Sequence, residues 1–138
     1  MHTGGEILVI EDDADDRDIL NEVFLRLGYS NKIVFFKDST DVVPYLLSHK
    51  VKPFMVISDI NMPKMDGFEL RDMILNDERL VDNCVPYIFF STSKDNTNVV
   101  KAYKAAAQGY FKKDDDLDKY TETVRKIIEY WKDCITPE

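Results

Sequence analysis

Cysteine is scarce in this chain of 138 residues, which has only Cys84 and Cys134. The two lie far apart in the sequence, without the close spacing of a zinc site, so a metal centre built on thiolates is excluded. No apolar run approaches the length of a membrane span, and the opening "MHTGGE" has no signal-peptide character. We therefore expect a cytoplasmic protein with reduced thiols.

An excess of positive charge is also absent. Asp and Glu number 26 against 18 Lys and Arg, for a formal net charge of −8. This balance argues against direct binding to nucleic acid or to an anionic membrane surface. The hydrophobic content of 44% and aromatic content of 12% are those of a globular protein. The length predicts a single domain over 1–138, with a core of about 6–132 and no output domain.

Short apolar segments alternate five times with segments of helical character. Strands are predicted over 6–11, 32–36, 54–59, 87–91 and 109–113. The first helix is predicted to end at Gly28. Four further helices are predicted within 38–50, 68–75, 95–107 and 117–131. Pro44 requires the second helix to begin late or to bend. Apolar strands bridged by helices predict an open, doubly wound α/β domain, with a parallel sheet covered by helices on both faces.

Polar and charged side chains follow four of the predicted strands, at the edge of the sheet where such folds bind ligands. They are Glu11, Asp12 and Asp13 after the first strand, Asp59 after the third, Ser91 and Thr92 after the fourth, and Lys112 and Lys113 after the fifth. Carboxylates this close repel one another unless a proton or a cation intervenes, and oxygen ligands suit Mg²⁺. Magnesium beside a lysine and a hydroxyl can hold a phosphoryl group. Asp59 is then the best candidate for a nucleophile that forms an acyl phosphate.

Four segments together resemble the receiver domain of two-component response regulators, in order and with family-like spacing. They are "ILVIEDD", "ISDINMPKMDG", "YIFFSTS" and "GYFKK", within about 6–131. The resemblance implies a flavodoxin-like fold with five strands in the order 2-1-3-4-5. It also implies that Asp59 accepts a phosphoryl group from a sensor histidine kinase or a phosphotransfer protein. The protein would then catalyse only its own phosphorylation and dephosphorylation, without turning over a metabolite.

The resemblance also implies a role for each remaining site residue. Asp12, Asp59 and the backbone carbonyl of Asn61 would ligate Mg²⁺, or Mn²⁺ in its place, with Glu11 acting through a bound water. Ser91 would be the switch hydroxyl, Tyr110 the movable switch aromatic and Lys113 the phosphate-binding lysine. The face formed by the fourth helix, fifth strand and fifth helix would then dock an unknown downstream protein or a second copy of the chain.

The sequence departs from the family pattern beside the lysine. Asp114 follows Lys113, where the family commonly has proline after a cis peptide bond, so the bond is either trans or a strained cis bond. This leaves Lys112 as an alternative, although the spacing favours Lys113. Thr92 replaces a smaller residue, and the connection before Pro86 is longer than in minimal receivers. With the ending "YWKDCITP", these features resemble the stand-alone receivers that pair with phytochrome-type histidine kinases.

Three other functions are compatible with the topology. A receiver-like interaction module that is never phosphorylated is favoured only by the altered lysine neighbourhood, since Asp59 and the acid pair of Glu11 and Asp12 are present. A magnesium phosphatase with an Asp nucleophile usually needs a second acid two residues later, where this chain has Asn61, which cannot donate a proton. A flavin or nucleotide carrier is excluded, because "EDDADDRD" follows the first strand in place of a loop whose amides bind phosphate.

Overall fold

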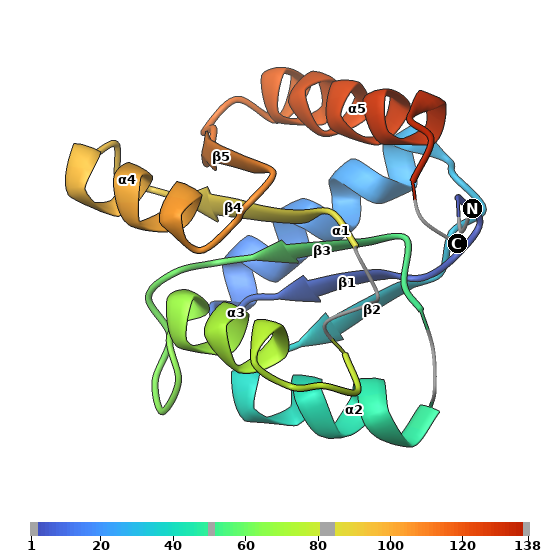
Figure 1. Cartoon of the computed structure of the whole chain (residues 1–138). Helices are drawn as coiled ribbons and strands as arrows, with labels where there is room; N and C mark the ends of the chain where they lie inside the picture. Colours follow the sequence, from blue (N-terminus) through green and yellow to red (C-terminus); the bar gives the residue numbers. More distant parts are fainter. Residues whose placement is uncertain (1–2, 50–51, 81–84, 137–138) are drawn as a thin grey trace.

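Five parallel strands form one sheet in the order β2-β1-β3-β4-β5 (Figure 1). The computed structural model describes residues 3–49, 52–80 and 85–136, so Cys84 lies outside the described residues. The strands are β1 (Ile7–Ile10), β2 (Ile33–Phe36), β3 (Met55–Ser58), β4 (Tyr87–Ser91) and β5 (Gly109–Lys112). The predicted doubly wound α/β fold and its strand order are confirmed.

Five helices cover the two faces of this sheet. They are α1 (Ala14–Leu27), α2 (Val42–His49), α3 (Gly67–Leu75), α4 (Asn96–Lys104) and α5 (Leu117–Asp133). Helices α1 and α5 pack on one face, whereas α2, α3 and α4 pack on the other (Figure 1). None of the helices in the described part of the chain is both long and apolar enough to cross a membrane.

The interior strand β1, between β2 and β3, is buried on both faces, which explains why its residues form a continuous apolar run. Leu8 and Ile10 join the core beneath α2, α3 and α4, and Ile7 and Val9 join the core beneath α1 and α5. All four are at most 1% exposed. Successive side chains of a strand point to opposite faces, so a strand covered on both sides must be apolar throughout. Because β1 is packed between the two layers of helices, the residues that follow it at the carboxyl edge of the sheet have a fixed position.

Aspartate side chains cap the first turns of most helices. Asp13 accepts from the backbone N–H groups of Asp15 and Asp16 at the start of α1. Asp116 caps α5 in the same way, accepting from the backbone N–H groups of Asp118 and Lys119. A 3₁₀ turn capped by Asp38 precedes α2, so this helix begins late and Pro44 falls in its first turn, where proline is tolerated.

Helix α4 is shorter than predicted, because it ends at Lys104 and not at Ala107. Ala106 adopts the left-handed conformation, with a φ of 59°, which stops the helix. The side chain of Arg71 on α3 donates hydrogen bonds to the carbonyls of Ala105 and Ala106, at 3.1 and 3.0 Å. Helical propensity is highest for alanine. The tertiary contact with Arg71 thus overrides the local preference of three consecutive alanines.

Candidate functional site

Three of the predicted site residues lie one position beyond the end of a strand, each held by a backbone hydrogen bond to the neighbouring strand. The bonds run from the N–H of Glu11 to Phe36 at 2.9 Å, from Asp59 to Ile10 at 2.9 Å and from Lys113 to Ser91 at 2.8 Å. The parallel register therefore aligns these side chains along the carboxyl edge of the sheet. The distances between these three residues are therefore set by the hydrogen-bonded strands of the sheet and not by a flexible loop.

Glu11, Asp12 and Asp59 form an acidic cluster at this edge. Each offers a carboxylate oxygen, and these oxygens all lie within 4.8 Å of one another. Glu11 is only 2% exposed, and the Asp59 side chain is 12% exposed. Asp13 lies outside the cluster because its carboxylate caps α1. Asp13, the third acidic candidate after the first strand, therefore does not join the cluster.

The electrostatics of the cluster suit a divalent cation. Burial raises the pKa of Glu11 to about 7; the hydrogen bond from Lys113 acts against this rise, and the nearby charge of Asp59 adds to it. Burial likewise raises the pKa of Asp59, although Lys113 lowers it in part. Both shifts reflect the cost of buried negative charge, which a cation would remove. An all-oxygen donor set of this kind fits Mg²⁺ or Mn²⁺.

Asn61, the remaining predicted ligand, lies in the loop between β3 and α3, two residues beyond Asp59. Its side chain is exposed, and the resemblance assigns to it only a backbone carbonyl. Its contribution to metal binding stays a prediction.

Lys113, and not Lys112, points into the acidic cluster. Its ammonium group donates to Glu11 and, at 2.9 Å, to Asp16, and lies 3.4 Å from Asp59 Oδ1. Burial lowers the pKa of Lys113, but the hydrogen bonds with Asp16 and Glu11 and the charge of Asp59 raise it above its usual value. Lys112 is exposed. All peptide bonds of the described residues are trans, including the one between Lys113 and Asp114.

The loop after Asp59 is packed tightly against the start of α3. The Gly67 N–H donates to the Ile60 carbonyl at 2.8 Å, and the buried Ser58 hydroxyl donates to the Asp59 carbonyl at 2.7 Å. A Cβ atom at position 67 would lie 2.3 Å from the Asp59 carbonyl oxygen, closer than any real contact. Glycine is therefore required here by close approach, and the loop presents Asp59 in one defined position.

Ser91 and Tyr110, the predicted switch residues, both contact Ser93 at the start of the loop that leads to α4. The buried Ser91 hydroxyl accepts from the Ser93 N–H at 3.1 Å, and the Tyr110 hydroxyl donates to the Ser93 carbonyl at 2.8 Å. Among the described residues, no hydrogen bond joins Ser91 to Asp59. Thr92 is exposed. The structure brings the serine and the tyrosine together through one loop residue.

Two contributions to the site were missed by sequence reasoning. Asp16 reaches Lys113 from the first turn of α1, and Arg17 donates to the Glu11 carbonyl at 2.9 Å. The signal for Asp16 was its place in the first turn of the helix that Asp13 caps. This turn begins directly beyond the acid pair, so its side chains lie near the same edge of the sheet.

The fold and this site define a class of protein: a doubly wound α/β domain with an acidic cluster and a lysine at the carboxyl edge of its sheet. A family model described as the response regulator receiver domain matches residues 7–125, and the chain belongs to that family. Receiver domains act in phosphorylation-dependent two-component signalling and are signalling proteins rather than metabolic enzymes. They bind Mg²⁺ or Mn²⁺ at an acidic pocket and interact with histidine kinases or phosphotransfer proteins.

Individual relatives agree with this assignment. The chain is 30% identical to the probable methanogenesis regulatory protein FilR2 of Methanothrix harundinacea, over 91% of this chain and 82% of the relative. The crystal structure of response regulator RPA3017 in red light signaling of R. palustris superposes with a TM-score of 0.85 at 26% identity, covering 97% and 99% of the two chains. The phosphorylated cyanobacterial phytochrome response regulator RcpA gives a TM-score of 0.83 at 24% identity, covering 96% of each chain. The resemblance to phytochrome-associated receivers therefore extends to the fold.

Proposed function

We propose that Asp59 is the phosphoacceptor of this receiver domain, and that a sensor histidine kinase or a phosphotransfer protein is the donor. The observation that carries the proposal is the position of the Asp59 carboxylate, 3.4 Å from the Lys113 ammonium and beside Glu11 and Asp12. The backbone of Asp59 is also held by its hydrogen bond to Ile10 and by the close approach of Gly67 to its carbonyl oxygen. A nucleophile of modest strength depends on such positioning and on charge neutralisation.

In the proposed reaction, a carboxylate oxygen of Asp59 attacks the phosphorus of a phosphohistidine. A P–O bond forms, the P–N bond breaks, and the imidazole nitrogen keeps the bonding electron pair. Asp12, Asp59 and the Asn61 carbonyl would hold Mg²⁺, with Glu11 acting through a water; the bound ion would supply positive charge beside the phosphoryl oxygens. Lys113 would bind a phosphoryl oxygen, and its raised pKa keeps it charged.

The phosphoryl group on Asp59 would then act on the loop that Ser91 and Tyr110 share. It brings new acceptor oxygens to the edge of the sheet, which can attract the Ser91 hydroxyl away from the Ser93 N–H. Movement of Ser93 would change the contact made by the Tyr110 hydroxyl on its carbonyl. The local charge change would thereby bias the position of the α4 segment.

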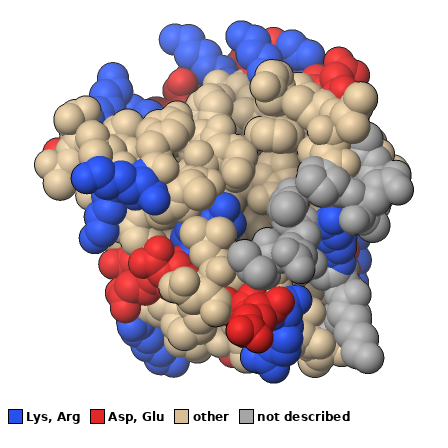
Figure 2. Space-filling model, in the orientation of Figure 1, with Lys and Arg blue, Asp and Glu red and all other residues tan. Residues whose placement is uncertain are grey.

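The face of α4, β5 and α5 is the docking surface that we propose for the signal. Figure 2 shows mostly uncharged surface between α4 and α5, and Val100, Tyr103 and Tyr130 are large exposed hydrophobic side chains on these two helices. Tyr130 also lines a groove together with Phe111 and Trp131. A downstream protein or a second copy of this chain would bind there, whereas nucleic acid and membrane would not. Cytoplasmic location and a single-domain organisation stay predictions.

The test is the intact mass of the protein after incubation with acetyl phosphate, with and without Mg²⁺, for the wild type and Asp59→Asn. We expect a gain of one phosphoryl group that requires Mg²⁺ and is absent in the variant. If the wild type gains nothing from acetyl phosphate, its cognate kinase is used as the donor. Failure with both donors would contradict the proposal and favour the receiver-like module that is never phosphorylated.

A further inference from the structure

We propose that Asp16 is a positioning residue for Lys113, which keeps the lysine ammonium directed at Asp59 while that carboxylate accepts the phosphoryl group. The inference rests on the proposed function of Asp59. It adds to the site an acidic residue from α1 that is neither the phosphoacceptor nor an expected metal ligand. Its carboxylate Oδ2 lies 2.9 Å from Lys113 Nζ, the shorter of the two separations from Asp16 and Asp59.

The ammonium group has three N–H donors and faces three carboxylates: Glu11, Asp16 and Asp59. Two of these have other roles in the proposed reaction, because Glu11 would act on the metal side and Asp59 would carry the phosphoryl group. Asp16 is the one of the three that neither carries the phosphoryl group nor acts at the proposed metal site. It is therefore the carboxylate that can hold Lys113 throughout the reaction.

The carboxylate of Asp16 is itself held in place by its helix. Asp16 is the third residue of α1, and its backbone N–H donates to the capping Asp13 side chain at 3.0 Å. A negative charge in the first turn of a helix is favoured by the helix dipole. Helix α1 packs against the sheet through Leu20, Val23 and Phe24, so the backbone that carries Asp16 belongs to a firmly packed element. Asp16 thus offers a fixed acceptor to a flexible side chain.

Lys113 needs such an anchor because little else in its own segment fixes its side chain. Its backbone N–H is bound to the Ser91 carbonyl, but four carbons separate the backbone from the ammonium. The following residue is Asp114, joined by a trans peptide bond, and not a proline. Side-chain contacts must therefore supply the orientation, and Asp16 supplies one from an element far away in sequence.

The experiment compares Asp16→Asn with Asp15→Asn as a matched control. Asp15 is the exposed neighbour in the same turn, so its substitution removes the same charge without touching the lysine. Two quantities are measured at saturating Mg²⁺: the second-order rate constant of phosphorylation by acetyl phosphate, and the dissociation constant for beryllofluoride, a non-covalent phosphoryl mimic. Asp16→Glu, which restores a carboxylate, tests rescue.

For Asp16→Asn we expect a rate constant lower by about three- to tenfold and a matching weakening of beryllofluoride binding, because the ammonium is less often in place. Asp15→Asn should change both quantities by less than about twofold, and Asp16→Glu should recover part of the loss. In a Lys113→Ala background, Asp16→Asn should have no further effect, since Asp16 acts through that lysine.

Three results would overturn the inference while leaving the proposed function intact. They are an Asp16→Asn protein that matches Asp15→Asn, an equal loss with and without Lys113, and a loss of beryllofluoride binding that Asp16→Glu does not recover at all. If the wild type neither takes up a phosphoryl group nor binds beryllofluoride, the proposed function itself fails, and this inference fails with it. The beryllofluoride comparison needs no Lys113 variant, so it tests the role of Asp16 even if Lys113→Ala does not fold.

Discussion

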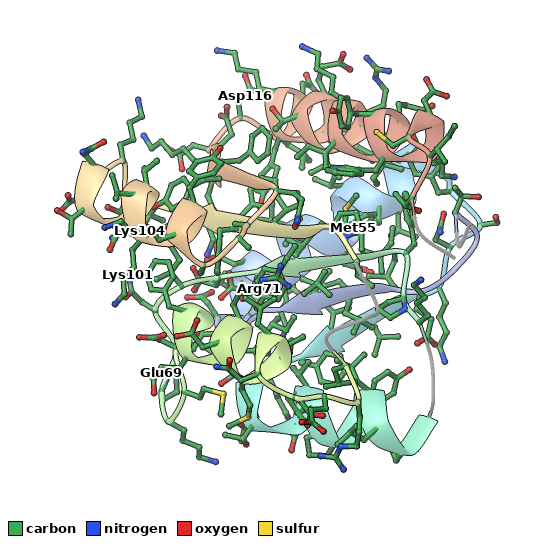
Figure 3. All side chains as sticks on the ribbon, viewed as in Figure 1. Met55, Glu69, Arg71, Lys101, Lys104 and Asp116 are labelled. Carbon is green, nitrogen blue, oxygen red and sulfur yellow. The ribbon has the colours of Figure 1, made fainter. Side chains whose placement is uncertain are left out.

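Lys113 and Arg71 are both largely buried cations, and the two regions around them differ in chemistry. The Lys113 side chain is 10% exposed and faces three carboxylates at the carboxyl edge of the sheet. Arg71 is 7% exposed and lies on the sheet side of α3 (Figure 3). Within the described ranges, Arg71 forms no ion pair; its partners are two backbone carbonyls and the ring of Tyr87, 4.8 Å from the guanidinium carbon.

The surroundings of Arg71 suit a permanent role in the fold. Ala105 and Ala106 directly follow α4, where carbonyls lack partners within the helix, and the planar guanidinium binds these two carbonyls with separate N–H groups. Arg71 therefore joins α3 to the end of α4. Burial lowers the pKa of Arg71, but the side chain stays charged because the usual value is so high.

The surroundings of Lys113 suit exchange of partners. Negative charge exceeds positive charge there, so a metal ion or a phosphoryl group can redistribute the contacts of the ammonium group. Burial of a charge therefore does not by itself mark a reactive site. What matters is whether the partners of that charge can change, as carboxylates at an open edge can and helix-end carbonyls cannot.

The largest effect on chemistry is expected from Lys113→Ala. Loss of the ammonium removes the charge that faces the phosphoryl group, so the phosphorylation rate constant should fall by about 10²–10³-fold. Lys112→Ala, which changes the exposed neighbour, should leave the rate unchanged. Intact-mass time courses with acetyl phosphate measure both variants. Equal phosphorylation rates for the two variants would contradict the assignment of Lys113, rather than Lys112, as the phosphate-binding lysine.

Arg71→Met should reverse that pattern, with a large effect on stability and a small one on chemistry. Two buried carbonyls lose their donors, and we expect the free energy of unfolding to fall by about 2–3 kcal/mol. Arg79→Met, which alters an exposed arginine paired with Asp77, serves as the control and should leave stability unchanged. Urea denaturation measures stability, and phosphorylation of the folded variant should stay within about threefold of the wild type. A stable but inactive Arg71→Met would contradict the structural assignment.

The stability of the metal-free protein should fall as the pH rises from about 4.5 to about 7. Glu11 has a folded pKa of about 7, above the ordinary pKa of 4.5 for glutamate, so the folded state binds the proton more tightly across this window. The raised pKa of Asp59 acts in the same direction, and Lys113 stays charged throughout. The expected loss is on the order of 3 kcal/mol.

Chemical denaturation at a series of pH values in the presence of a chelator measures this slope. Glu11→Gln removes the titrating carboxylate and should reduce the dependence of the free energy of unfolding on pH. Saturating Mg²⁺ at pH 7.5 should restore stability by binding only the folded state. A metal-free stability that rises with pH across the window would contradict the account of the acidic cluster.

A smaller effect is expected at the cap that holds Asp16. Asp13→Ala removes the acceptor for the N–H groups of Asp15 and Asp16, and should lower the free energy of unfolding by about 1 kcal/mol. Asp13→Asn keeps a capping side chain and is the control. If both variants match the wild type in urea denaturation, α1 does not depend on this cap.

Much of this molecule could be predicted from its sequence, because the relevant signals are local. Strand β1 is apolar at every position since both of its faces are covered, and the polar residues that follow the strands meet at one edge through the parallel register. The register predicts the edge at which the candidate residues lie, whereas the preference for Lys113 over Lys112 came from the spacing of the family that the chain resembles.

The rest depended on contacts that no local pattern carries. The alanines at the end of α4 favour helix by propensity, and only the reach of Arg71 from α3 explains why the helix stops. Asp16 stands in a run of acidic residues that looks uniform in sequence. Its distinction from the exposed Asp15 arises from the direction in which α1 leaves the sheet.

The most direct test of Asp59 as the phosphoacceptor is to locate the phosphoryl group on the protein. Borohydride reduction of the acyl phosphate converts the modified aspartate to homoserine, which peptide mass spectrometry can place in the sequence. We predict homoserine at position 59 alone, after phosphorylation by acetyl phosphate or a kinase. Homoserine at position 12, 13 or 16, with Asp59 intact, would contradict the account.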